Sequence, residues 1–341
     1  MTQRVLGDAT VRPIGLGCMN LSHGYSNFPS PRDGAHLLRE ALDAGIDHLD
    51  TATLYGGGRN EELVGAAVAD RCREFFLASK CGLELSGGKA RIDGRPQTIR
   101  RQAEESLSNL RTDFIDLYYL HRLDPDVPIE DSVGAMSELV QEGMIGAIGL
   151  SEVSVATLRR AHGVHPIAAV QNEYSLWTRN PELGMLDACR ELGTTFVAFS
   201  PLGRAFLTGT LTDPAALPPG DMRHHMPRFS AENYPRNLAL LDGVRAVADR
   251  VGASLAQIAL AWVVAQGEHV VAIPGTTSLE HLRENLGAEE VVLDAATLAE
   301  LDALVNQDTV HGHRYNAAQQ ATIDSEDFPS AQDPAGAARA G

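Results

Sequence analysis

Short apolar runs alternate with longer amphipathic runs along almost the whole chain. Most of the short runs are nearly continuous in hydrophobic residues, which is typical of parallel strands buried on both faces. Eight such runs are present: Arg12–Cys18, Ile46–Asp50, Phe75–Lys80, Phe114–His121, Ile145–Ser151, Ala168–Asn172, Thr195–Ser200 and Val270–Gly275. We expect each of them to form a strand.

Helical periodicity fills the intervals between these runs. The predicted helices span residues 32–44, 60–70, 97–110, 130–142, 154–162, 181–192 and 254–266. Gly45 ends the first helix, and Pro181 suits the first turn of the sixth. Strand–helix alternation repeated eight times predicts a parallel α/β sheet that closes most simply into a single (β/α)8 TIM barrel.

An open doubly wound sheet is the alternative architecture. Such a sheet usually carries G-x-G-x-x-G after its first strand, to bind a nucleotide. The corresponding run here, Gly15–Asn20, lacks the third glycine, so the barrel is favoured.

Two segments depart from the alternating pattern. Residues 203–236 form a long polar loop after the seventh strand, which we expect to act as a flap over the active face. Residues 317–341 contain few apolar side chains, and a flexible tail is predicted for them. The barrel domain is therefore expected to span residues 1–316.

Composition narrows the possible functions. A length of 341 residues suits one α/β barrel, and a net charge of -17 disfavours binding to nucleic acid or to anionic membranes. The four cysteines show no C-x-x-C spacing, and the chain contains no stretch of eighteen apolar residues. The first residues have no apolar core, so we expect no signal peptide. We expect a cytoplasmic protein with no metal site and predict no protein partner; His224-His225 and His311–His313 are interpreted as polar surface.

Four chemically useful side chains follow three successive strands. Asp50 ends the second strand with Tyr55 five residues later, Lys80 ends the third, and His121 ends the fourth. Reactive groups of a parallel barrel gather at the carboxyl ends of its strands. Each residue alone is an ordinary cap, surface charge or packed ring, but together they form a set that can donate a proton to a carbonyl oxygen.

The chemistry of this set is specific. A free tyrosine titrates near ~10, and a nearby ammonium lowers that value. Asp50 can neutralise a buried Lys80, and a neutral His121 can hydrogen-bond a carbonyl. A proton donor of this kind contributes roughly 10²–10⁴-fold to a rate.

Several longer motifs resemble the aldo-keto reductase family. Asp50–Gly65, Ser106–His121 and Ile273–Asn285 are similar to its three signatures, in the right order. Ala168–Arg179 and Phe199–Gly209 resemble the bacterial and plant branch that includes pyridoxal reductases and broad carbonyl reductases.

The resemblance implies NADPH-dependent reduction of an aldehyde or ketone, with Tyr55 as proton donor, Lys80 lowering its pKa, Asp50 holding Lys80 and His121 orienting the carbonyl. The cofactor would lie extended across the barrel mouth, without a Rossmann domain. Residues implied to bind it are Gly17, Met19, Ser151, Gln171, Phe199, Ser200, Leu202, Arg204, Gly275, Thr276, Thr277, His281, Glu284 and Asn285. Ser151 and Gln171 would bind the nicotinamide amide, Phe199 would stack on the ring, and Arg204 would contact the pyrophosphate.

Three positions depart from the family pattern. Glu152 stands where many relatives have Asn, and a carboxylate cannot donate to the nicotinamide amide. Phe199 replaces a commoner tyrosine. Thr277-Ser278 replaces the Lys or Arg that clamps the 2′-phosphate of NADP, leaving His281, Arg283 and Arg204 as cations. NADP(H) is the expected cofactor, and NAD(H) stays open.

Other functions remain open at the level of sequence. A non-catalytic NADPH-binding redox sensor of the same fold needs the cofactor contacts but no proton donor, and the enzyme itself could prefer NADH or oxidise alcohols. A metal-dependent barrel hydrolase needs ligands where Gly17-Cys18-Met19 stand. The substrate is expected to be a small carbonyl compound, with pyridoxal suggested by the resemblance alone. Its specificity would come from residues 20–30, 83–95 and 203–236, while Met19 and Trp177 are either pocket or rim residues.

Overall fold

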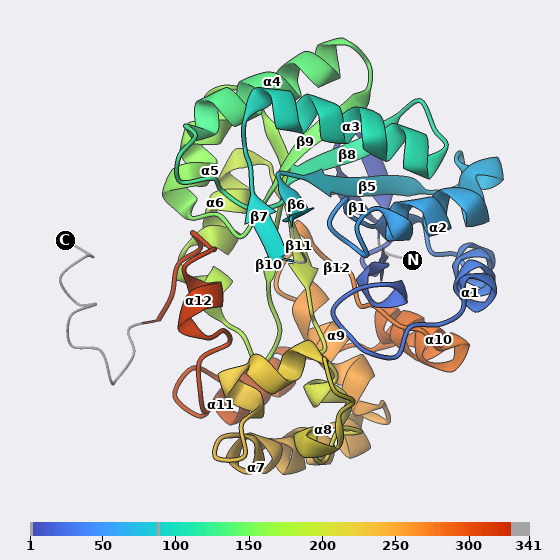
Figure 1. Ribbon diagram of the computed structural model, residues 1–341. Coiled ribbons are helices and arrows are strands. Elements are labelled where there is room, and N and C mark those ends of the chain that lie inside the picture. Colours follow the sequence, from blue (N-terminus) through green and yellow to red (C-terminus); the bar gives the residue numbers. More distant parts are fainter. Residues whose placement is uncertain (1–2, 87–88, 329–341) are drawn as a thin grey trace.

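The computed structural model describes residues 3–86 and 89–328, and its centre is a parallel barrel surrounded by helices (Figure 1). Neighbouring strands pair in parallel, in the spatial order β12-β11-β10-β9-β8-β5-β4-β3. The strands are β3 (Leu16–Gly17), β4 (His48–Asp50), β5 (Phe76–Cys81), β8 (Ile115–Leu120), β9 (Ile145–Ser151), β10 (Ile167–Glu173), β11 (Thr195–Phe199) and β12 (Val270–Ala272).

The ring closes between its first and last strands. Ile14 pairs in parallel with Ala272 of β12, and the amide of Gly15 donates to the carbonyl of Ala272 at 2.9 Å. Further along, the Gly17 amide donates to the Pro274 carbonyl at 3.2 Å. The predicted barrel is confirmed, and the open doubly wound sheet is wrong.

In the described chain, one helix follows each barrel strand. These helices are α1 (Pro31–Asp43), α2 (Arg59–Val68), α3 (Pro96–Leu110), α4 (Ile129–Gln141), α5 (Val155–His162), α6 (Met185–Leu192), α9 (Leu255–Val264) and α10 (Leu279–Gly287). Outside this repeat lie α7 (Tyr234–Leu238), α8 (Leu240–Val251), α11 (Ala295–Leu304) and α12 (Ala317–Gln320). The sequence pattern does not predict α8, α10 or α11. Its sixth helix, residues 181–192, is broken by Gly184 (φ 119°) into the 3₁₀ turn η3 (Asn180–Leu183) and α6.

Two antiparallel hairpins also escape the sequence prediction, because their strands are only three or four residues long. β1 (Arg4–Leu6) pairs with β2 (Ala9–Val11) before the barrel, and β6 (Leu83–Ser86) pairs with β7 (Lys89–Ile92) after β5. Both strands of the second hairpin lie within the segment 83–95, which was expected to shape specificity.

The barrel interior changes from apolar to polar towards the carboxyl ends of several strands, β5 and β8 among them. Because side chains of a strand alternate between its two faces, every second residue points inward. On β5 the inward side chains are Phe76, Ala78 and Lys80. On β8 they are Leu117 and Tyr119, and His121 continues the series directly after the strand. The apolar layer is closed from below by the first hairpin, whose Leu6 and Val11 pack in the same cluster. The polar layer therefore lies at the carboxyl ends of the strands.

Gly149 of β9 makes room for this interior. A Cβ atom at this position would lie 2.3 Å from the ring of Tyr119, far inside van der Waals contact. Glycine is therefore required where the Tyr119 ring crosses the barrel.

The segment after β11 is built from 3₁₀ turns rather than open loop. These are η4 (Phe206–Thr208), η5 (Pro214–Ala216), η6 (Met222–His225) and η7 (Pro227–Phe229). The remaining 3₁₀ turns are η1 (Met19–Leu21), η2 (Ala69–Arg71) and η8 (Ala288–Glu290).

Part of the expected tail lies against the barrel. Residues 317–328 include α12 and donate or accept hydrogen bonds at the ends of β9 and α5. The rest of the predicted tail, residues 329–341, lies outside the described residues.

No single helix of the described chain is long and apolar enough to cross a membrane. One bent pair, Tyr234–Val251 with Leu255–Val264, reaches the required length and hydropathy only when both parts are combined across an 87° bend. Most of Leu255–Val264 is buried in the protein core.

We predict that Leu6→Ala lowers the free energy of unfolding by about 2–5 kcal/mol, because it opens a cavity under the barrel. Chemical denaturation monitored by circular dichroism measures this change. Val5→Ala is the matched control, since the Val5 side chain, next to Leu6 in the same strand, is 60% exposed. Equal losses of unfolding free energy in both variants would show that the packing of Leu6 under the barrel does not stabilise it.

Candidate active site

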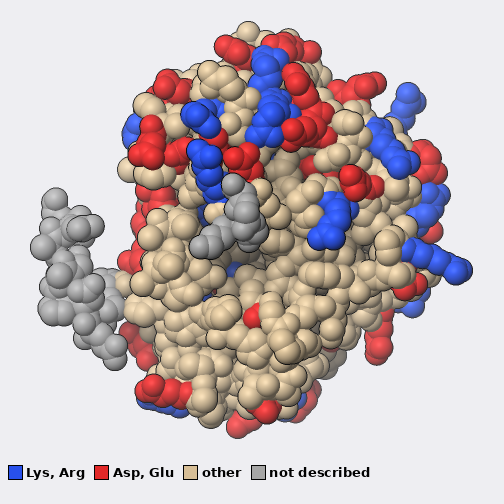
Figure 2. Space-filling view, viewed as in Figure 1, with Lys and Arg blue, Asp and Glu red and all other residues tan. Residues whose placement is uncertain are grey.

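A cavity of about 530 Å³ opens at the carboxyl ends of the barrel strands. Figure 2 shows this face of the molecule: Lys, Arg, Asp and Glu gather over the upper helices, and largely uncharged surface surrounds the central hollow. Every site residue expected from the sequence lines the cavity except Lys80. The lining members are Asp50, Tyr55, His121, Gly17, Met19, Ser151, Gln171, Phe199, Ser200, Leu202, Arg204, Gly275, Thr276, Thr277, His281, Glu284 and Asn285. The structure thus brings the expected residues together, while their individual roles stay predictions.

Lys80 lies directly beneath the cavity floor and is fully buried. Its ammonium forms an ion pair with Asp50 Oδ1 and donates to the Thr51 carbonyl at 2.9 Å and to the Tyr55 hydroxyl at 3.3 Å. An ammonium has three N–H donors, and these three acceptors match them. The side chain is thereby fixed in one orientation, with its charge against the phenol.

The pKa values of this group depend mainly on burial. Burial, with the charge of Asp50, raises the pKa of Tyr55 above its ordinary value of 10.0, although the charge and hydrogen bond of Lys80 act to lower it. The expected net lowering is therefore not found, although the effect of Lys80 has the expected sign. Burial lowers the pKa of Lys80, but Asp50 and Tyr55 outweigh this and raise it. Lys80 stays charged and Tyr55 stays protonated at neutral pH.

His121 faces Tyr55 across the cavity floor. The two rings meet edge to face, with their centroids 5.8 Å apart. Burial and the nearby charges of Arg122 and Lys80 hold the pKa of His121 well below 6.5, so the imidazole is neutral. Its Nδ1 is buried and has no hydrogen-bond partner among the described residues. A neutral ring next to the phenol can hydrogen-bond a carbonyl oxygen.

Gln171 and Ser151, expected at the nicotinamide amide, have partners of their own. Gln171 Nε2 donates to Asp50 Oδ2 at 2.7 Å, and Ser151 Oγ accepts from Arg122 Nη1 at 3.3 Å. Sequence reasoning missed Arg122, although it directly follows His121 at a strand end. It lines the cavity and forms no ion pair within the described chain.

Glu152 and Arg204, which were considered as cofactor contacts, form ion pairs within the protein. Glu152 does not line the cavity; it is buried and paired with Arg314. Arg204 lines the cavity, but its guanidinium pairs with Glu173 at 3.0 Å. Sequence reasoning missed Glu173 and Arg314 because one lies within an apolar strand and the other just before a segment read as flexible.

The opposite end of the cavity is formed by the turn between β12 and α10. Thr276 Oγ1 accepts from the Ser278 amide at 3.0 Å, and Ser278 Oγ caps α10 by accepting from the His281 amide at 3.4 Å. The Ser278 hydroxyl is therefore committed to the helix. Thr277 and His281 line the cavity, whereas the Arg283 side chain is 69% exposed.

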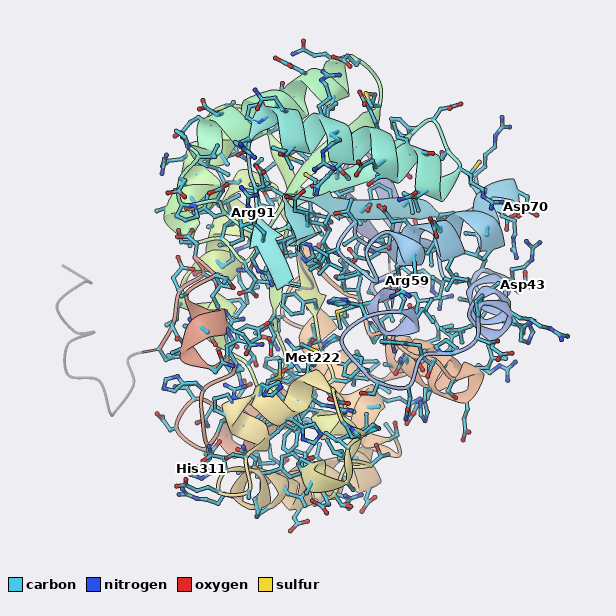
Figure 3. The ribbon with its side chains drawn as sticks, in the orientation of Figure 1. Asp43, Arg59, Asp70, Arg91, Met222 and His311 are labelled. Atoms are coloured by element: carbon cyan, nitrogen blue, oxygen red, sulfur yellow. The ribbon has the colours of Figure 1, made fainter. Side chains whose placement is uncertain are left out.

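The segment 203–236 crosses the active face, as expected for a flap. Ser26 Oγ donates to the Pro219 carbonyl at 2.9 Å, and the Met222 amide donates to the Gly24 carbonyl at 3.2 Å. Met222 lies near the centre of the view in Figure 3 and lines the cavity. Trp177 is a rim residue, since it stacks on Phe206 with centroids 3.9 Å apart and is not part of the described cavity lining.

The remaining motifs have structural roles. The run Gly56–Gly58 has positive φ throughout and turns the chain into α2. His224 Nε2 contacts the carbonyl of Pro218 at 3.1 Å, and His311 lies at the edge of the molecule in Figure 3. Among the described residues, no cluster of three His, Cys, Asp or Glu side chains could hold a metal ion.

Comparison with known proteins gives one consistent result. Residues 13–306 match the model of the aldo/keto reductase family. The chain is 43% identical over 307 residues to probable aldo-keto reductase 1 of Glycine max, covering 89% of this chain and 88% of that protein.

Solved structures agree with this match. A glycerol dehydrogenase from Gluconobacter oxydans superposes with a TM-score of 0.80 at 28% identity, over 96% of this chain and 98% of that one. An aldo/keto reductase from Klebsiella pneumoniae, solved in complex with NADP and acetate, has a TM-score of 0.70 at 28% identity over 92% and 99% of the two chains.

We predict that Lys80→Met lowers the free energy of unfolding by roughly 3–5 kcal/mol, because it leaves the Asp50 carboxylate buried without its partner. The double variant Asp50→Asn/Lys80→Met should regain part of this loss, since both charges are removed. Urea denaturation measures both effects.

The matched control is Arg250→Met, which breaks an exposed pair with Glu300 whose side chains are 53% and 43% exposed. Exposed pairs contribute at most about 1 kcal/mol. A loss for Lys80→Met as small as that of the control would show that the buried pair does not stabilise the barrel.

Proposed function

The chain belongs to the aldo/keto reductase family, and from this premise we propose that it reduces an aldehyde or ketone to an alcohol with NADPH as hydride source. The observation that carries the proposal is the buried contact of Lys80 with both Asp50 and Tyr55 beneath a cavity faced by a neutral His121. Family membership places the protein among oxidoreductases; the role of each residue is our inference.

Tyr55 is the proton donor in this proposal. A donor must hold its proton at neutral pH, and burial ensures this by raising the pKa of the phenol. Once the proton leaves, the phenolate lies 3.3 Å from the Lys80 ammonium, which stabilises the negative charge. Burial keeps the acid protonated, and Lys80 lowers the cost of its ionisation.

His121 orients the carbonyl. Because its ring is neutral, one nitrogen can donate a hydrogen bond to the substrate oxygen without competing with Tyr55 for the proton. The edge-to-face contact with Tyr55 keeps both groups at one end of the cavity. A carbonyl oxygen near both rings would receive an orienting hydrogen bond and a proton.

The cavity residues fit a nicotinamide dinucleotide. Phe199 supplies an aromatic face, Ser200 and Leu202 lie on the same wall, and Thr277, His281 and Asn285 supply polar groups at the far end. When bound, the dinucleotide supplies the hydride. The Klebsiella pneumoniae relative was solved with NADP, which supports this choice.

Preference for NADPH over NADH would rest on a small set of groups. Thr277 and His281 line the cavity near the start of α10, where the helix dipole favours an anion. Arg204 is engaged with Glu173, so it is a weaker candidate than the sequence suggested.

We predict that Tyr55→Phe retains NADPH binding but reduces 4-nitrobenzaldehyde roughly 10²–10⁴-fold more slowly, because only the proton donor is removed. Tyr25→Phe is the matched control, since Tyr25 lines the same cavity and its ring contacts the Arg223 guanidinium. NADPH oxidation followed by absorbance gives the rates, and fluorescence titration gives the affinities.

Unchanged turnover by Tyr55→Phe would overturn the mechanism. A wild-type protein that binds NADPH yet reduces no carbonyl in a panel including pyridoxal would instead favour a redox sensor.

A second prediction concerns the cofactor. NADPH should give a higher kcat/KM than NADH, and Thr277→Glu should shift the ratio towards NADH because its carboxylate repels a 2′-phosphate. Thr277→Gln, similar in size and uncharged, is the control. Steady-state kinetics with both cofactors would refute the preference if NADH were already favoured by the wild-type protein.

A further inference from the structure

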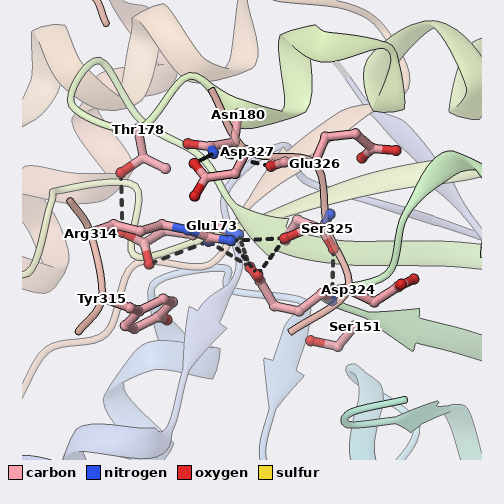
Figure 4. Close-up of polar contacts among 12 residues, drawn as sticks. Ser151, Glu173, Thr178, Asn180, Arg314, Tyr315, Asp324, Ser325, Glu326 and Asp327 are labelled. Atoms are coloured by element: carbon pink, nitrogen blue, oxygen red, sulfur yellow. Dashed lines mark hydrogen bonds and ion pairs between the residues drawn. The ribbon is translucent and has the colours of Figure 1, made fainter. Parts of the chain in front are cut away.

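The segment 314–327, which we call the C-terminal arm, is hydrogen-bonded to the barrel at the start of α5. Asp324 Oδ2 accepts from the Ser154 amide at 2.8 Å and from Thr157 Oγ1 at 2.7 Å, at the start of α5. Glu326 Oε1 accepts from the Val155 amide at 2.7 Å. Figure 4 shows these arm residues beside the ends of the barrel strands. The arm is therefore part of the folded barrel.

Glu152 is the buried anchor of the arm. Its carboxylate accepts from Arg314 Nη1 at 3.0 Å and from Arg314 Nη2 at 2.7 Å, a bidentate pair. Ser325 Oγ and the Glu173 amide also donate to it, at 2.9 Å and 2.8 Å. Burial raises the pKa of Glu152, but Arg314 outweighs this and lowers it to about 2. Glu152 is consequently charged, and both of its carboxylate oxygens accept hydrogen bonds from the arm or from β10.

The charges continue from this anchor to the cavity wall. Glu173 Oε2 lies 3.8 Å from Arg314 Nη1 and 3.0 Å from Arg204 Nη2. Two carboxylates and two guanidiniums thus alternate in the order Glu152, Arg314, Glu173, Arg204, which we call the charge array. No member is more than 8% exposed.

The last member of the charge array is tied to a residue of the arm. Arg204 Nη2 donates to the Tyr315 hydroxyl at 2.9 Å, and both side chains line the cavity. The Arg314 guanidinium also lies over the Tyr315 ring, 5.0 Å from its centroid. Glu152 is therefore connected to the cavity wall by a continuous series of contacts through Arg314 and Tyr315.

Backbone strain is concentrated in the same region. Glu152, Arg204 and Ala205 have φ values of 53°, 56° and 74°, and Ser200 has 49°. Non-glycine residues rarely adopt this left-handed conformation, which persists where surrounding contacts enforce it. The ion pairs of Glu152 and Arg204 are such contacts.

We propose that Glu152 and Arg314 are positioning residues, which hold Tyr315 and Arg204 in the cavity wall so that the C-terminal arm completes the dinucleotide-binding site. The proposal rests on the proposed function, because it assumes that NADPH occupies this cavity. Without the Glu152 carboxylate, Glu173 is the remaining ion-pair partner of Arg314 among the described residues, and Arg314 competes with Arg204 for it. Arg204 and Tyr315 then lose their fixed positions.

A double-variant cycle separates positioning from stability. Glu152→Gln leaves the buried Arg314 with only its longer ion pair to Glu173, and Arg314→Met leaves the buried Glu152 carboxylate without its ion-pair partner, so both should lower the midpoint of urea denaturation. The combined variant removes both charges and should regain most of the midpoint. Its NADPH affinity should not recover, because Tyr315 and Arg204 still lack their anchor.

NADPH affinity and hydrogen exchange are measured for each variant of the cycle, and Tyr315→Phe is added as a further variant. We expect the Kd for NADPH, from quenching of tryptophan fluorescence, to rise about tenfold or more in both single variants and in the combined one. Hydrogen exchange of residues 314–327 in the cofactor-free protein should be faster in all three. Tyr315→Phe, which removes only the hydroxyl that binds Arg204, should raise the Kd severalfold with little change in the midpoint.

The matched control is Glu130→Gln, which breaks an exposed pair with Arg160 whose side chains are 41% and 57% exposed. It should change neither Kd nor exchange of the arm. Recovery of NADPH affinity together with stability in the combined variant would overturn the proposal, as would wild-type affinity or wild-type arm exchange in the folded single variants. A wild-type protein that fails to bind NADPH would overturn the proposed function, whereas wild-type binding that the variants share would overturn only this inference.

Discussion

The buried ion pair between Lys80 and Asp50 is the interaction on which the rest of the site depends. A fully buried ammonium is expensive unless its donors are satisfied, and here Asp50, the Thr51 carbonyl and the Tyr55 hydroxyl satisfy all three. That arrangement fixes the phenol beside a positive charge. Gln171 holds the second oxygen of Asp50, so the pair is also tied to the opposite side of the barrel.

The barrel makes this pair possible by separating two layers. Inward positions near the first hairpin are apolar, whereas the carboxyl ends carry the polar side chains of Asp50, His121 and Gln171. The low polarity beneath Lys80 has two consequences: it strengthens the ion pair, and it raises the pKa of Tyr55. Burial that stabilises the acid form and a cation that stabilises its conjugate base act on the same side chain. Both effects follow from the place of Tyr55 and Lys80 above the apolar layer.

Much of this could be predicted from the sequence, because strand ends are readable from hydrophobic runs and Asp50, Lys80 and His121 stand at three of them. The raised pKa of Tyr55 could not be predicted from the sequence, since desolvation depends on how the side chains pack around the phenol. The partners of Glu152 and Arg204 were also hidden: Arg314, which pairs with Glu152, lies beside a segment of low hydrophobicity more than a hundred residues away, and Glu173, which pairs with Arg204, ends an apolar strand. The short strands of the two hairpins lie below the length at which periodicity is informative.

In the proposed mechanism, Tyr55 is a buried acid whose ionisation is assisted by Lys80. Titration of tyrosinate absorbance in the cofactor-free protein tests it most directly, with Tyr55→Phe identifying the signal of Tyr55. We expect Tyr55 to ionise above pH 10.0 in the wild-type protein and at still higher pH in Lys80→Met, where the favourable charge is lost. Ionisation of Tyr55 near neutral pH, or a titration that Lys80→Met leaves unchanged, would contradict this role of Lys80 and of burial.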